Sequence, residues 1–131
     1  MLYARNADRR ARATERNYGA PHPVYGGTRA DEVRAMRCLA AGRADHRCRS
    51  QVEAAHVDAR GMGGAGGDRR KLAPLCHEAH REAGELPSLW MRSDPERYRT
   101  TQRGAWEHRH ELDLLAEAEA IAERLDGEGY P

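Results

Sequence analysis

The 131-residue sequence contains no phenylalanine and has few apolar residues of any kind. Hydrophobic residues make up 39% of the chain and aromatic residues 5%, against 33% charged residues. So little apolar material excludes a large conventional core, and small domains of this type usually need disulfides, a metal ion or a partner subunit. We therefore expect one small domain with flanking segments, stabilised by more than side-chain burial.

Long apolar runs are missing as well. No segment approaches the roughly 18 apolar residues of a membrane span. The first residues, MLYARNADRRARATER, are charged throughout and lack the apolar centre of a signal peptide. These absences predict a cytoplasmic protein without membrane contact. In that compartment, the three cysteines suit metal binding or free thiols better than disulfides.

The net charge of +1 conceals a gradient along the chain. Residues 1–60 contain 12 Arg against 7 acidic residues, whereas residues 105–131 contain 2 Arg against 8 acidic residues. A basic front suits a polyanion such as DNA, and an acidic end suits self-association or docking onto a larger protein. An Arg-rich composition without any such partner would give the same gradient, so charge alone does not decide.

Patterning divides the chain into three segments. Residues 1–30 carry Arg, Ala, Gly and Pro without a sustained period, which predicts an extended basic arm. Residues 31–104 form the expected central module. Residues 105–131 contain the clearest helix, over 106–125, with an apolar stripe and acidic residues on its other faces. This stripe is expected to pack on the central module or on a second copy of the chain.

Within the central module, the periodicity predicts a short helix over 30–41 and a strand over 51–60. The glycine-rich stretch GMGGAGGD at 61–68 excludes regular structure and predicts a loop. A helix is expected over 76–84, ended by its final glycine. The sequence Ser-Asp-Pro-Glu at 93–96 predicts the start of a further short helix.

Cysteine and histidine residues gather in this module. Cys38 and Cys48 precede the expected strand, His56 follows its apolar part, and Cys76 opens a Cys-His-x-x-His motif that ends at His80. Thiolate and imidazole are the ligands that zinc favours. Each signal alone is weak, because a lone His at a strand end is usually structural and isolated cysteines are often buried thiols. Their combination in one short stretch favours a metal site.

The stretch EAAHVDARGMGGAGGDRRKLAPLCHEAHRE, residues 53–82, resembles the HNH (ββα-metal) nuclease signature in a variant common among phage and prophage proteins. That variant has an Ala-His-[Val/Ile] strand, a Gly/Lys-rich loop with an Asp, and Pro-Leu-Cys leading to a His on a helix. The resemblance extends over 38–84 when the upstream cysteine is included. It implies an α+β fold in which a short β-hairpin and a helix surround a metal ion, flanked by further helices.

The resemblance also implies roles for the motif residues. His56 would be the general base that takes a proton from the attacking water, a task suited to imidazole near neutral pH. His80 would bind a catalytic Mg²⁺ or Mn²⁺ ion, with Asp68 as an orienting or metal-binding carboxylate and Asp58 as a further candidate ligand. Basic residues around the glycine loop would contact DNA phosphates, unless they are only solvated charges: Arg60, Arg69, Arg70 and Lys71.

The cysteines depart from the family's pattern. Many relatives carry two Cys-x-x-Cys pairs that bind a structural zinc ion, but Ala41 and Ala79 stand where the second cysteines would be. A remaining zinc site would use three cysteines and one histidine, His77 or His46: Cys38, Cys48 and Cys76 would supply the thiolates. The alternative is that zinc has been lost and the cysteines are buried.

The catalytic centre departs from the pattern too. Lys71 stands where the family's Asn orients the catalytic His, and Ala55 stands where relatives often carry an acidic residue or a second His. We predict a metal-dependent endonuclease that hydrolyses phosphodiester bonds in DNA. The alternatives are a zinc-stapled DNA-binding or adaptor module with a decayed active site, and an interaction protein of a phage or defence system that docks a larger partner through its acidic helix.

Overall fold

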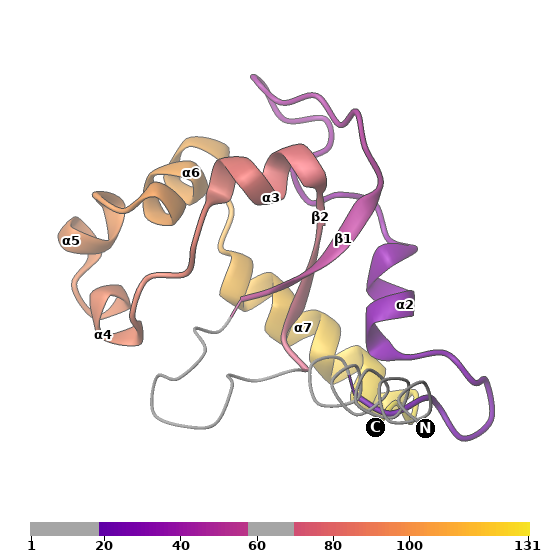
Figure 1. Cartoon of the computed structure of the whole chain (residues 1–131). Coiled ribbons are helices and arrows are strands. Elements are labelled where there is room, and N and C mark those ends of the chain that lie inside the picture. The colour runs from indigo at the N-terminus through magenta and orange to yellow at the C-terminus, as the bar shows by residue number, and fades with distance from the viewer. Residues whose placement is uncertain (1–18, 58–69) are drawn as a thin grey trace, which may run out of the picture.

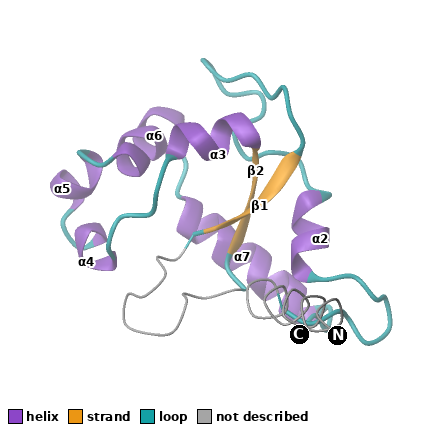
Figure 2. Ribbon diagram, viewed as in Figure 1, coloured by secondary structure: helices purple, strands orange, loops and turns teal. Residues whose placement is uncertain are grey.

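A computed structural model describes residues 19–57 and 70–131 of the chain. Its centre is a two-stranded antiparallel sheet of β1 (Val52–His56) and β2 (Leu72–Cys76). The helices of the described segments are α2 (Arg29–Arg34), α3 (His77–Ala83), α4 (Leu89–Arg92), α5 (Pro95–Arg99), α6 (Gln102–His110) and α7 (Leu114–Gly127). The described part of the chain is therefore a small α+β fold, which confirms the expected fold class at this level (Figure 2).

The helices are distributed around the hairpin as Figure 1 shows. α2 packs on both strands, and α3, which begins directly after β2, also contacts both. α6 lies beside α3, and α5 and α4 continue from it away from the hairpin, while α7 returns along β2. Among these helices, none is both long and apolar enough to cross a membrane.

The strand register explains how β2 accommodates a proline. Ala54 lies opposite Pro74, and the neighbouring pairs join Ala55 to Ala73 and Glu53 to Leu75. In an antiparallel ladder, alternate pairs exchange hydrogen bonds, and the N–H and C=O groups of the other pairs point outward. The Pro74 carbonyl points outward, since it accepts the N–H of Leu39 at 3.0 Å. The missing proline N–H therefore costs no bond between the strands.

Side chains from the two faces of the hairpin enter two separate apolar clusters, because successive strand residues point to opposite faces. The first cluster lies on the side of α3 and α6 and contains Cys38, Ala40, Ala55, Val57, Ala73, Leu75, Cys76, Ala79, Ala83, Trp106, Leu112, Leu114 and Ala118. The second lies on the side of α2 and the end of α7 and contains Ala30, Val33, Ala54, Leu72, Leu125 and Tyr130. The apolar stripe of the C-terminal region thus packs on the chain's own hairpin.

α2 is shorter than the helix expected over 30–41. Thr28 caps its start, with a side chain that accepts the N–H of Asp31, while the Asp31 carboxylate accepts the N–H of Thr28. The helix ends at Arg34 because the following backbone makes other bonds, including the one from Leu39 to β2. By contrast, α3 matches its expected range closely and ends at Gly84, whose φ of +74° favours glycine.

The single helix expected over 106–125 is wrong, because the chain forms two helices there. Glu111 ends α6 in the left-handed conformation, with φ of +53°. Asp113 then caps α7 by accepting the N–H of Ala116 at 3.2 Å. The carboxylate of Glu107, which is buried, accepts the N–H of Leu114 at 3.2 Å. These side-chain acceptors replace the helical bonds that a continuous helix would have made across the break.

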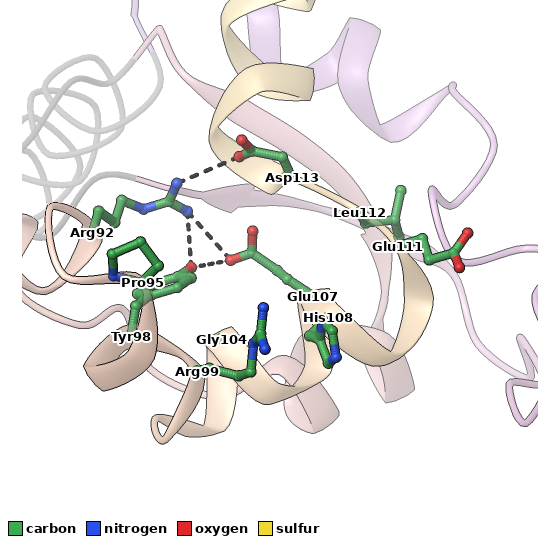
Figure 3. A pocket seen from close by; sticks show the side chains of 10 residues that line it. All are labelled: Arg92, Pro95, Tyr98, Arg99, Gly104, Glu107, His108, Glu111, Leu112 and Asp113. Carbon is green, nitrogen blue, oxygen red and sulfur yellow. Dashed lines mark hydrogen bonds and ion pairs between the residues drawn. The ribbon is translucent and has the colours of Figure 1, made fainter.

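Glu107 also ties the break to the preceding helices, as Figure 3 shows. Its carboxylate accepts a hydrogen bond from the Tyr98 hydroxyl and lies 3.3 Å from Arg92 Nη2. Arg92 lies 3.4 Å from Asp113 and donates to the Tyr98 hydroxyl at 2.9 Å. Burial, together with the bond to Glu107, raises the pKa of Tyr98. These groups line a pocket in which they satisfy one another, so we assign the pocket a structural role.

Arg29 holds the C-terminal segment against α2. Its side chain is 2% exposed, and its Nε donates to the carbonyl of Pro131 at 2.8 Å. Its Nη2 donates to the carbonyl of Tyr130 at 2.7 Å and pairs with the carboxylate of Asp126. A buried guanidinium is stable only when its N–H groups are satisfied, and residues of α7 and of the segment that follows it supply the acceptors here.

Candidate metal centre

Three cysteines and one histidine converge beside the first residue of α3. The ligand atoms of Cys38, His46, Cys48 and Cys76 all lie within 4.8 Å of one another. His46 Nε2 is 3.2 Å from Cys48 Sγ and 3.3 Å from Cys76 Sγ. Ligand atoms around a tetrahedral zinc ion with bonds of 2.0 to 2.3 Å are roughly 3.3 to 3.8 Å apart. The group therefore has the chemistry, number and spacing to hold a metal such as zinc.

Different elements deliver the four ligands. Cys76 ends β2 and caps α3, with its sulfur 3.4 Å from the N–H of Ala79. Cys38 follows α2, and its sulfur accepts the N–H of Cys76 at 3.3 Å. His46 and Cys48 come from the connection between α2 and β1, which turns at Asp45 in the left-handed conformation, with φ of +63°. The metal centre thus joins α2, the hairpin and α3 at one point.

The Glu82 carboxylate of α3 contacts His46 at the ring nitrogen that faces away from the cysteine sulfurs. The imidazole is fully buried, and its Nδ1 lies 3.2 Å from Glu82 Oε2, which also accepts the indole N–H of Trp106 at 3.3 Å. When Nδ1 donates to this carboxylate, the lone pair of Nε2 faces the cysteine sulfurs. A carboxylate behind the imidazole is the usual arrangement at protein zinc sites, where it fixes the tautomer and the ring orientation.

Two thiols of the group, those of Cys76 and Cys48, have raised pKa values, which favours their neutral form. Burial is the main reason that the pKa of Cys76 is raised to about 12, and the nearby sulfurs of Cys48 and Cys38 add to the shift. Burial and the nearby Cys38 also raise the pKa of Cys48. Three close thiols resist ionising together unless a cation neutralises their charge, and metal binding would release their protons.

His77 does not belong to this group, so the fourth ligand is His46. His77 is the first residue of α3, and its Nδ1 lies 3.4 Å from Glu53 Oε2 on β1. Its side chain is 56% exposed. The strand-to-helix corner turns Cys76 toward the loop before β1 and turns His77 toward β1 itself, which separates two adjacent residues.

The Glu53 carboxylate lies between the two histidines of α3. Its Oε1 is 3.0 Å from His80 Nδ1, and its Oε2 is the atom that faces His77. Partial burial raises the pKa of Glu53, but the hydrogen bonds and positive charge of His80 and His77 outweigh this effect and lower it. Glu53 was not predicted as a site residue. The available signal was its position two residues before Ala55, on the same face of β1.

His56 lies at the far end of β1, opposite Leu72, and is partly exposed. It is three residues beyond Glu53, about 10 Å along the strand, and an odd separation directs the two side chains to opposite faces. The structure therefore brings His80 to Glu53 and places His56 on the other side of the strand. The remaining predicted residues Asp58, Arg60, Asp68 and Arg69 lie outside the described segments.

Arg70 and Lys71, both predicted phosphate contacts, lie close to acidic residues of α7. Arg70 Nη1 is 3.9 Å from Asp126 Oδ2, and Lys71 Nζ is 3.8 Å from Glu119 Oε1. Two exposed arginines, Arg47 and Arg49, stand on either side of Cys48 in the loop that carries His46.

No protein-family model, curated protein or solved structure matches this chain. The resemblance to HNH nucleases therefore depends on the motif residues, and the function has to be argued from the site itself.

Proposed function

We propose that this protein is a metal-dependent endonuclease that hydrolyses phosphodiester bonds in DNA and carries a structural zinc ion. The observation that carries the proposal is the ββα unit: β1 ends at His56, β2 leads directly into α3, and α3 presents His80 to β1. A hairpin with a histidine at the end of its first strand, followed by a helix that carries a histidine, is the unit that the resemblance to HNH nucleases implies. The unit supports the proposal by its order and by its position beside the metal centre.

The zinc ion would act as a structural staple in this proposal. Its ligands connect the loop after α2 to the corner between β2 and α3, at the edge of the first apolar cluster. Closed Cys and His sites of four ligands are typical of structural zinc. The centre would hold α3, and with it His80, at a fixed angle to the hairpin.

His56 would take a proton from the attacking water. Its imidazole is partly exposed and suits a base at neutral pH. In an in-line displacement, the attacking and leaving oxygens are on opposite sides of the phosphorus. When bound at His80, a divalent cation would stabilise negative charge on the leaving oxygen.

A supercoiled-plasmid assay tests the proposal. Zinc-loaded protein, with its zinc content measured, is incubated with Mg²⁺, with Mn²⁺ or with neither. We expect nicking that needs the added cation and is lost in His56→Ala and in His80→Ala. His108→Ala, which changes an exposed histidine on α6, is the matched control and should cut like the wild type. Absence of nicking by folded wild-type protein under every condition would overturn the proposal.

A second candidate is a zinc-stapled module that binds DNA or a protein partner without cutting. The observation that favours it is that His56 and His80 lie on opposite faces of β1, while Ala55 and Lys71 occupy two positions where relatives carry site residues. This candidate predicts salt-dependent DNA binding that does not change in His56→Ala. Electrophoretic mobility shifts at two salt concentrations, beside the plasmid assay, separate the two functions.

A further inference from the structure

The Glu53 carboxylate has a position that the structural zinc does not explain. It extends from β1 toward α3 and meets two imidazoles that are not ligands of the Cys and His group. Glu53, His77 and His80 are each between 41% and 56% exposed at their side chains, so ions in solution can reach them. The placement of a carboxylate between two accessible imidazoles therefore needs a reason other than the Cys and His group.

We propose that Glu53 and His80 form a second cation site, which binds Mn²⁺ in preference to Mg²⁺ through Glu53 Oε1 and His80 Nδ1. This inference rests on the proposed function in one respect, because it identifies the carboxylate that would hold the catalytic cation. It assigns that task to Glu53 of the hairpin, in place of Asp58 or Asp68.

The distance between the two ligand atoms fits this assignment. Glu53 Oε1 and His80 Nδ1 are 3.0 Å apart. Neighbouring ligands of an octahedral ion with bonds of about 2.1 Å are also about 3.0 Å apart. An ion can therefore enter with small movements of the side chains. The other positions of the octahedron would remain open to water or to a phosphate oxygen, as is usual for ions that act on phosphodiesters.

The surroundings hold the carboxylate in place for such an ion. His77 Nδ1 contacts the second oxygen, Glu53 Oε2, at 3.4 Å and leaves Oε1 directed at His80. β1 and α3 also contact one another directly, so the two ligands stand on packed elements. Ligands on rigid elements keep their geometry in the absence of the ion, which lowers the free-energy cost of binding.

The ligand chemistry sets the preference among metals. Three thiolates and an imidazole favour zinc, whereas Mg²⁺ favours all-oxygen surroundings. One carboxylate with one imidazole lies between these extremes and suits Mn²⁺ better than Mg²⁺. The two sites should therefore bind different metals from a mixture, with zinc in the Cys and His group and manganese at Glu53.

Binding of Mn²⁺ to the full-length, zinc-loaded protein tests this site without DNA. Electron paramagnetic resonance of free Mn²⁺ gives the affinity, and paramagnetic broadening of amide signals gives the location. We expect one bound ion, broadening centred on residues 52–54 and 77–81, and weak competition by Mg²⁺. Glu53→Gln and His80→Ala should each weaken binding by about 10-fold or more. Glu123→Gln and His108→Ala, which change exposed residues elsewhere, should bind like the wild type.

Two results would overturn the site: wild-type protein that binds no Mn²⁺, or Glu53→Gln protein that binds it as tightly as the wild type. Circular dichroism and zinc content verify that each variant is folded. Mn²⁺ binding at Glu53 without any nicking would keep this site and remove the nuclease proposal. Nicking that persists unchanged in Glu53→Gln would keep the nuclease and show that Glu53 does not hold its catalytic cation.

Discussion

On the α3 side of the hairpin, the small side chains of Ala55 and Ala73 share a cluster with Trp106 and with two metal ligands. On the α2 side, Ala54 and Leu72 pack with Leu125, and the adjoining C-terminal segment is bound by buried Arg29. Both faces contain few apolar atoms, but their polar groups differ. Arg29 finds its acceptors within the chain, whereas the thiols of the candidate metal centre need a cation to neutralise their charge when they ionise.

This difference shows two ways in which a chain with a small core is stabilised. On the α2 side, the buried guanidinium of Arg29 donates to backbone carbonyls of the same chain, so its N–H groups have acceptors without any added ligand. The α3 side brings together three thiols, two of which have raised pKa values, and a bound cation would stabilise their ionised form. We therefore expect the α3 face to depend on metal and the α2 face to be independent of it.

Removal of zinc should have the largest effect. Structural zinc contributes roughly 10 to 16 kcal/mol of apparent binding free energy, comparable to the whole stability of a small domain. We expect chelation, or Cys76→Ser, to abolish the cooperative thermal transition seen by circular dichroism. Re-addition of zinc to the chelated wild type should restore it. An unchanged melting curve without metal would show that the α3 face does not need the ion.

Arg29→Ala should have the next largest effect. It removes the donors to Pro131 and Tyr130 and leaves their carbonyls and Asp126 without this partner. We expect the free energy of unfolding to fall by about 2 to 4 kcal/mol, measured by urea denaturation with zinc present. Arg34→Ala, on the exposed side of α2, should change it by no more than about 0.5 kcal/mol. Loss of zinc from folded Arg29→Ala protein would contradict the independence of the two faces.

Glu82→Gln should have a smaller effect, confined to the α3 face. The amide keeps the size of the side chain but removes the charge behind His46. We expect zinc affinity to fall by about 10- to 100-fold, measured by competition with a chromogenic chelator. Glu85→Gln, an exposed neighbour beyond the end of α3, is the control and should retain wild-type affinity. Equal affinities for the two variants would remove the role we give to Glu82.

Local signals in the sequence were sufficient for the described part of the strand that contains β1, for α3 and for the three cysteines of the Cys and His group. The end of α3 was predictable because Gly84 adopts a conformation that other residues avoid. The choice between His46 and His77 as the fourth member of the group was not predictable from the sequence. It depends on the corner between β2 and α3 and on the loop before β1, which bring distant residues together. Ligand identity was therefore predictable as a set of residue types, but not as a complete list.

The break between α6 and α7 shows why periodicity alone misled the prediction. The apolar stripe from Leu114 to Leu125 lies entirely in α7, and the pattern gave no sign that Trp106 belongs to a separate helix. The decisive group is the buried carboxylate of Glu107, which accepts the N–H of Leu114 and pairs with Arg92 of α4. Glu53 escaped prediction for a related reason, since an acidic residue in a strand is normally expected to face solvent. Both outcomes depend on partners far away in the sequence.

Pro74 has a consequence for encounters between molecules. An exposed strand edge offers free N–H and C=O groups to which a strand of another chain can add. Along β2, proline removes one of these donors, Leu39 occupies the carbonyl of Pro74, and the N–H of Cys76 is bound to the sulfur of Cys38. A foreign strand would have to displace the loop that holds a metal ligand before it could pair there. The loop that carries Cys38 thus covers the edge of β2 against pairing with a strand of another chain.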